Sequence, residues 1–136
     1  MKYNGVIQRK LALLDDQVRR LERHTKDVTE QAFVDDWVMR SMAERAVQVA
    51  VEIMIDVAER IIALSGAGPV AGAAEAIDAL AQLGVIHSAE PYRSMVRFRN
   101  LIVHEYARID PAVLYDIVTN RLDGFRAFRD EIDRAE

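Results

Sequence analysis

The residues best suited to chemistry in this sequence fall within one short segment, Arg99-Asn100-Leu101-Ile102-Val103-His104-Glu105-Tyr106. The segment holds a guanidinium, a carboxamide, an imidazole and a phenol. On a helix, Asn100 and His104 are four residues apart and share a face, while Arg99 is offset from Asn100 by about 100° and can reach across with its long side chain. This set of groups suits the binding of a phosphodiester and the transfer of a proton near neutral pH.

Positive charge is concentrated around the same segment. The whole chain has a formal net charge of -4, which argues against a protein that coats nucleic acid through its entire surface. Between Pro91 and Arg108, four arginines stand against a single acid, Glu105, so this window carries +3 and the remainder of the chain -7. Arginine outnumbers lysine 15 to 3, a bias that favours forked hydrogen bonds to phosphate or carboxylate.

Spacing alone leaves a purely structural explanation open, because one Arg and one His within a helix are common. In that explanation His104 caps or packs at a helix end, and Arg99 pairs with an acid such as Glu52. Tyr106 is then a buried phenol that supports the turn after the helix. Glu52 and Asp56 form either an acidic pair facing a cleft or a solvated, salt-bridged stripe.

Length and composition predict one all-helical domain over residues 1–136. Half of the residues are hydrophobic, with only 6 Gly and 3 Pro, which is typical of helix-forming chains. The absence of cysteine excludes disulfides and thiolate metal sites, and the three histidines are scattered, so we expect no metal site. No apolar run approaches the roughly 18 residues of a membrane span, so a cytoplasmic protein that does not contact the membrane is expected.

Apolar spacing places the helices. Ile7, Leu11, Leu14, Val18 and Leu21 recur at steps of four and three, which marks one buried stripe. Similar patterns and capping residues predict a bundle of about five to six helices, at residues 3–23, 30–37, 38–64, 73–83, 88–106 and from 110 to near the end of the sequence.

Several finer expectations follow from these patterns. Phe33 and Trp37, four residues apart, should both be core anchors, and Ser88 should cap the helix that carries the Arg99 segment. The helix over residues 38–64 has more apolar surface than a small helical domain readily covers, including Val47, Val51, Met54, Ile55 and Ile62. This excess predicts a homodimer with that helix near the shared surface.

The pattern Arg99-x4-His104-x-Tyr106 resembles the signature of the HEPN superfamily, specifically its HepT-like branch. The resemblance covers nearly the whole chain, including the long helix with VEIMIDVAERIIA, the Gly/Pro break after it and the ID before the final helices. It implies an up-and-down helical bundle that forms a homodimer, with two Arg/His pairs meeting in a cleft between subunits. It also implies a metal-independent endoribonuclease toxin that needs no cofactor.

The resemblance further assigns roles to single residues. His104 would act as general base or acid on RNA, Arg99 would stabilise the charge that develops on phosphate, and Asn100 would orient the site. Tyr106 would receive AMP from an MntA-like minimal nucleotidyltransferase antitoxin, which would close the site. Two other functions stay open: a noncatalytic subunit that presents a substrate or nucleotide to a nucleotidyltransferase, and a structural helical dimer without a ligand.

Overall fold

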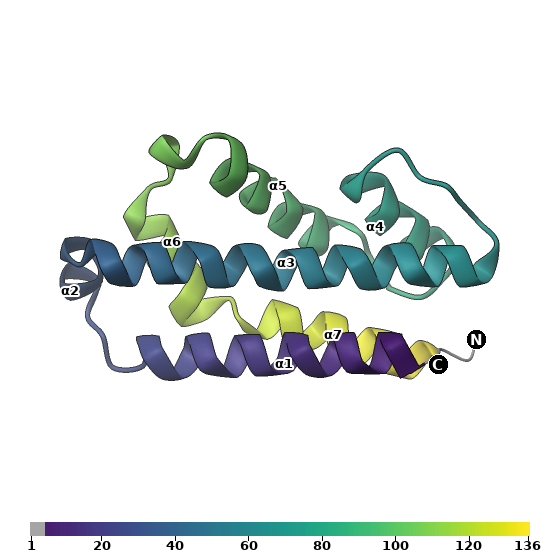
Figure 1. Cartoon of the computed structure of the whole chain (residues 1–136), viewed down its shortest axis with the longest axis horizontal. Helices are drawn as coiled ribbons and strands as arrows, with labels where there is room; N and C mark the ends of the chain where they lie inside the picture. The colour runs from purple at the N-terminus through teal and green to yellow at the C-terminus, as the bar shows by residue number, and fades with distance from the viewer. Residues whose placement is uncertain (1–4) are drawn as a thin grey trace.

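The fold is all-helical, as the sequence predicts. The structure is a computed structural model that describes residues 5–136. These residues form seven α-helices, one 3-10 helix and no strand. The elements are α1 (Gly5–Thr25), α2 (Glu30–Asp35), α3 (Trp37–Ser65), α4 (Ala73–Gln82), α5 (Glu90–His104), η1 (Tyr106–Arg108), α6 (Pro111–Asn120) and α7 (Asp123–Ala135). The longer helices α1, α3, α5 and α7 run in alternating directions, which is an up-and-down arrangement (Figure 1). Tyr3, the predicted start of the first helix, lies outside the described residues.

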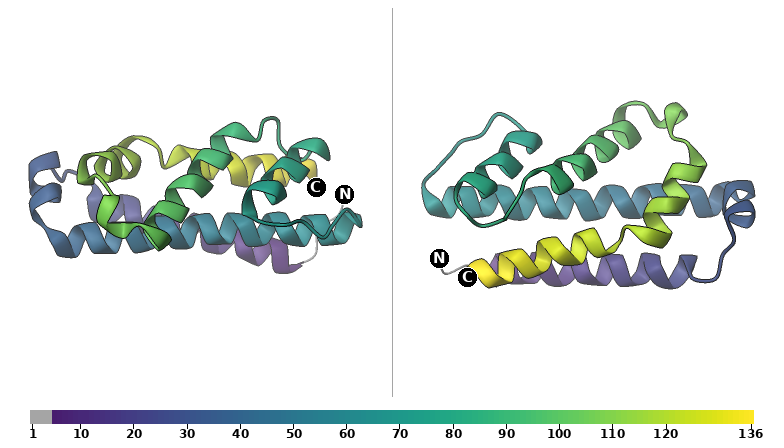
Figure 2. Two further views of the ribbon diagram at one scale, coloured as in Figure 1. Left: turned by 90° about the horizontal axis from the view of Figure 1, so that it is seen from above. Right: turned by 180° about the vertical axis from the view of Figure 1, so that it is seen from behind.

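The described residues hold more helices than the five to six expected, because the C-terminal segment forms two helices. Arg121 leaves the helical conformation, with φ -122° and ψ 7°, although its backbone N–H still bonds the Ile117 carbonyl at 3.0 Å. The apolar residues Ile117 and Leu122 are five positions apart, so one straight helix would place them on different faces. This spacing is the signal in the sequence for a break between two helices. After this turn, α7 lies beside α1 and runs antiparallel to it (Figure 2).

The prediction that both Phe33 and Trp37 anchor the core is half right. Phe33 is fully buried and contacts Tyr115, with ring centroids 5.4 Å apart. Trp37 is 67% exposed. The reason is Asp36, which ends α2 and caps α3 by accepting the Met39 backbone N–H at 3.1 Å. The two aromatic residues therefore belong to different helices, and a four-residue spacing no longer puts them on one face.

The core forms around α3, which lies between the α4–α5 layer and the α1–α7 layer (Figure 1). The predicted stripe of α1 is confirmed, because Ile7, Leu11, Leu14, Val18 and Leu21 are each at most 4% exposed. The apolar residues of α3 that were expected to need a second subunit are no more than 8% exposed within the single chain. That sequence argument for a dimer is therefore wrong, since α1, α4, α5 and α6 already cover α3.

Single residues determine where several helices stop and start. Gly66 ends α3 in the left-handed conformation at φ 76°, which glycine adopts without the steric penalty of a Cβ. Asp110 caps α6, its carboxylate accepting the Ala112 N–H at 2.9 Å. Ser88 does not cap α5 as predicted, because the helix begins one residue later, after Ala89. No helix in the described part of the chain has the length and apolarity to cross a membrane.

Helix α5 crosses α3 obliquely, and α7 holds its N-terminal half (Figure 2). Tyr92 of α5 is 3% exposed and meets Phe128 of α7 edge to face, with centroids 5.2 Å apart. Its hydroxyl donates a hydrogen bond to the Glu131 carboxylate, whose other oxygen accepts the His87 backbone N–H at 2.8 Å. Burial raises the pKa of the Tyr92 hydroxyl well above its usual range, and the hydrogen bond and charge of Glu131 raise it further.

This environment predicts a loss of stability at alkaline pH. In the unfolded chain Tyr92 loses its proton near pH 10, whereas in the folded chain it keeps it, so the free energy of unfolding should fall as pH rises above about 10. The Tyr92→Phe variant should show a shallower fall, measurable by urea denaturation between pH 8 and 11. Equal slopes for the two proteins would contradict the assignment.

Candidate functional site

Three of the four predicted site residues lie on the last turns of α5, and Tyr106 follows at the start of η1. Asn100 and His104 share one face of the helix, as predicted. Arg99 lies on the side that carries Val96 and Ile102, which are 2% and 8% exposed. Because Arg99 and His104 are five positions apart in the sequence, they lie about 140° apart around the helix and about 7.5 Å apart along it.

Arg99 is half-buried and unpaired. Its Nε is shielded from solvent and has no hydrogen-bond partner, and within residues 5–136 no carboxylate lies within ion-pair distance of its guanidinium. The structural alternative, a pair with Glu52, is absent, because Glu52 accepts a hydrogen bond from Gln48 at 2.7 Å. Leaving a partly desolvated charge without a partner costs free energy, which indicates that Arg99 is kept for something other than the fold.

The other arginines of the positive window are engaged. Arg93 pairs with Asp78 of α4 at 3.5 Å through a terminal nitrogen, although its Nε, like that of Arg99, is shielded and has no hydrogen-bond partner. Arg108 pairs with its neighbour Glu105 at 3.2 Å. Arg97 pairs with Glu90 at 2.6 Å, and this hydrogen bond lowers the pKa of the Glu90 carboxyl. In the part of the chain that the structure describes, Arg99 is thus the one arginine of this window without an acidic partner.

His104 and Tyr106 are both exposed. His104 is the last residue of α5, and Glu105, with φ -142°, takes the chain out of the helix. Tyr106 is 77% exposed, which rules out the buried phenol of the structural alternative. Among the described residues, neither side chain has a hydrogen-bond partner. Both groups are open to a ligand or a partner protein.

The acidic residues Glu52 and Asp56 do not form a pair facing a cleft. Asp56 binds Lys10 of α1 at 2.6 Å and Arg60 at 3.1 Å. Burial acts to raise the pKa of the Asp56 carboxyl, but the hydrogen bonds and charges of Lys10 and Arg60 outweigh it and lower the pKa. The salt-bridged stripe is the interpretation that the structure confirms.

A groove that sequence reasoning missed lies beside α5. It measures about 890 Å³ and opens between α5, α6 and α7 above α3, over an apolar floor of Val47, Val51, Met95, Phe98, Ile117 and Phe125. Its walls come from four helices, so no local pattern in the sequence marks it. Arg99, His104 and Tyr106 do not line it.

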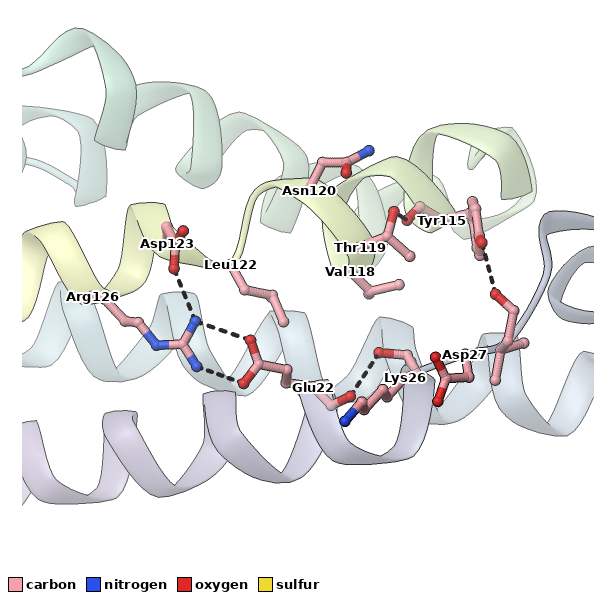
Figure 3. A pocket seen from close by; sticks show the side chains of 12 residues that line it. Glu22, Lys26, Asp27, Tyr115, Val118, Thr119, Asn120, Leu122, Asp123 and Arg126 are labelled. Atoms are coloured by element: carbon pink, nitrogen blue, oxygen red, sulfur yellow. Dashed lines mark hydrogen bonds and ion pairs between the residues drawn. The ribbon is translucent and has the colours of Figure 1, made fainter.

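A smaller hollow of about 360 Å³ lies between the end of α1 and the α6–α7 turn (Figure 3). At its side, the Arg126 guanidinium binds both Glu22 oxygens, at 2.9 and 3.1 Å, and Asp123 at 2.9 Å. The Tyr115 hydroxyl donates to the Val28 carbonyl at 2.7 Å. These groups satisfy one another and join α1 to the C-terminal helices, and none of the predicted site residues lies here.

Comparison with known proteins gives consistent results for family and fold. The sequence model of the family described as "Ribonuclease HepT-like" matches residues 14–132. The chain is 24% identical over 131 residues to the mRNA nuclease HepT of Shewanella oneidensis, covering 95% of this chain and 97% of that protein.

Solved structures share the fold at low identity. A toxin–antitoxin complex with AMP-PNP has a chain that aligns with a TM-score of 0.88 at 24% identity, covering 98% of this chain and all of that one. The tri-AMPylated HEPN toxin of S. oneidensis in complex with an MNT antitoxin aligns with a TM-score of 0.89, again at 24% identity and over 98% and 100% of the chains. The cytosolic protein YutE of Bacillus subtilis, of unknown function, aligns at 0.80 with 14% identity, covering 96% and 88%.

Because Arg99 has no partner, its removal should not weaken the fold. We expect Arg99→Met to change the free energy of unfolding by no more than about 0.5 kcal/mol, or to increase it. The matched control, Arg126→Met, removes bonds to Glu22 and Asp123 and should lower it by about 1 to 2 kcal/mol. Both values come from denaturant unfolding. A loss at Arg99 as large as that at Arg126 would show that Arg99 has a structural role.

Proposed function

This chain belongs to the HepT-like ribonuclease family, and we propose that Arg99 and His104 are the groups with which it cleaves RNA. The family description, the mRNA nuclease HepT relative and the HEPN toxin solved with its antitoxin support an endoribonuclease of a toxin–antitoxin pair. The observation that carries the residue assignment is the unpaired, half-buried guanidinium of Arg99, five residues before the exposed imidazole of His104 on the same helix. A guanidinium kept free of carboxylates suits a phosphate ligand, to which it donates two parallel hydrogen bonds.

The chemistry needs only a base, an acid and a stabilised phosphate. His104 as general base takes the proton from the ribose 2'-hydroxyl, whose oxygen attacks the adjacent phosphorus. Arg99 stabilises the negative charge that develops on the phosphate oxygens. The bond from phosphorus to the 5'-oxygen breaks, and that oxygen takes up a proton from a protonated imidazole. The products are a 2',3'-cyclic phosphate and a 5'-hydroxyl, and Asn100 orients the phosphate from the same face as His104.

The proposed active form is a homodimer that forms through the C-terminal end of α5. Arg99 and His104 point to different sides of α5, so two copies packed through the ends of their α5 helices would supply both groups to one cleft. Exposed apolar side chains surround this end of the molecule: Val103 is 41%, Tyr106 77% and Val113 47% exposed. A second copy would cover part of this surface.

The partner in the proposal is an MntA-like nucleotidyltransferase antitoxin that modifies Tyr106. The Tyr106 oxygen would attack the α-phosphorus of ATP, form a phosphodiester with AMP and release pyrophosphate, while the hydroxyl proton is lost. Its exposure makes the hydroxyl accessible to such a transfer. The added negative phosphate would lie two residues from His104 and compete with RNA for Arg99.

The nuclease proposal predicts cleavage of RNA by the purified protein in the presence of a chelator. Arg99→Ala and His104→Ala should each reduce the rate by about 10² to 10⁴-fold. The matched control is His24→Ala, an exposed histidine in the last turn of α1, which should cleave at the wild-type rate. Binding to a nucleotidyltransferase without any cleavage, even at high protein concentration, would instead support the noncatalytic subunit.

The antitoxin proposal predicts modification at one tyrosine. Incubation with the nucleotidyltransferase, ATP and Mg²⁺ should add AMP to the wild type, seen by mass spectrometry, and stop RNA cleavage. Tyr106→Phe should cleave RNA but stay unmodified, whereas Tyr115→Phe should still be modified, because the Tyr115 hydroxyl is bound to Val28. AMP on Tyr106→Phe would place the acceptor elsewhere.

A further inference from the structure

We propose that Glu131 of α7 is a positioning residue for the cleavage reaction: it fixes the tilt of α5 and so determines where Arg99 and His104 lie. The inference rests on the proposed function of that pair. Glu131 belongs to the C-terminal part of the chain, outside the Arg99–Tyr106 segment, and its role comes from the contacts between α7 and α5.

One stripe of α7 faces α5. Gly124, Phe128 and Glu131 are spaced by four and three residues, so they share a face of α7. An ideal Cβ on Gly124 would lie 2.2 Å from the methyl of Met95, which shows how closely the helices approach there. Phe128 meets the Tyr92 ring edge to face. Glu131 completes the stripe at the end of α7 that faces the beginning of α5.

The Glu131 carboxylate joins two consecutive parts of the chain. One oxygen accepts the Tyr92 hydroxyl from inside the first turns of α5, and the other accepts the His87 backbone N–H at 2.8 Å, just before the helix begins. A single side chain therefore fixes both the entry to α5 and a point on its body. Because Tyr92 is buried, a loss of this acceptor would leave its hydroxyl without a partner in an apolar setting.

The far end of α5 has few contacts of its own. Ile102 is buried, but Val103 is 41% exposed, and His104 and the following Tyr106 are exposed as well. The direction of the last turn of α5 therefore depends on the contacts that α3, α4 and α7 make with the rest of the helix.

A small change in the tilt of α5 at Tyr92 produces a larger displacement of His104 at the other end of the helix. Tyr92 and His104 are twelve residues apart, which is about 18 Å along the helix. A tilt of about 5° at Tyr92 would move His104 by about 1.5 Å. Misplacement of a reacting group by about 1 Å can reduce a rate by about 10²-fold, so the tilt of α5 is a quantity to which cleavage is sensitive.

The test uses Glu131→Gln in the full-length chain, with Asp133→Asn as the matched control. Both changes remove one negative charge from α7, but Asp133 is exposed and has no side-chain partner among the described residues. We expect Glu131→Gln and Tyr92→Phe each to lower kcat for RNA cleavage by at least about 10-fold with KM within about twofold of the wild type. Asp133→Asn should leave both constants unchanged.

A second measurement follows α5 itself. The chain has no cysteine, so nitroxide labels can be attached at Arg45→Cys on α3 and Ala107→Cys in η1. Labelled protein is diluted with an excess of unlabelled protein, so that only distances within one chain are measured. Glu131→Gln should shift or broaden the distance distribution on the order of 1 to 2 Å, and Asp133→Asn should not.

The outcomes separate the two proposals. Cleavage by Glu131→Gln at the wild-type kcat would overturn the positioning role while the proposed function stands. A wild-type protein that does not cleave RNA would overturn the proposed function. In that case the label distances alone decide on Glu131: a shift in Glu131→Gln supports its control of α5, and an unchanged distribution overturns it.

Discussion

The constraint on which the structure depends is the burial of α3. This helix has 29 residues and apolar side chains around most of its circumference, so other segments must cover it from several directions. α1 covers one side, and α4, α5 and α6 cover others. The oblique path of α5 over α3 leaves its C-terminal end with few neighbours, and this is where the chain carries its reactive groups. The same packing of α5 against α3 therefore buries part of α3 and leaves the end of α5 that carries the candidate site exposed.

Much of the fold could be predicted because its signals are local. The stripe of α1, the glycine that ends α3 and the Asp110-Pro111 start of α6 each depend on residues within one or two turns. The errors arose where a tertiary contact or a single polar residue decided the outcome. Asp36 separated Phe33 from Trp37, and the cover of α3 by one chain followed from how four helices pack, which no spacing in the sequence shows.

The candidate site shows the same division. The types and order of Arg99, His104 and Tyr106 were visible in the sequence, and so was the shared face of Asn100 and His104. The sequence did not reveal that Arg99 would be the unpaired arginine of its window, because Arg93 finds its partner on α4. Nor did it reveal the contact of Tyr92 with Glu131, which are 39 residues apart. Ion pairs between segments that are distant in the sequence form only in the folded chain. Here they determine that Arg99 is the arginine left free to bind a ligand.

The position of Trp37 has a consequence for optical spectroscopy of this protein. It is the single tryptophan of the chain and stands 67% exposed at the start of α3, outside the core. An indole in water emits similarly in the native and the denatured chain, so its fluorescence is a weak monitor of core disruption. The same exposure makes it a sensitive reporter of any molecule that covers this end of α3, since desolvation of the ring would shift its emission towards the blue.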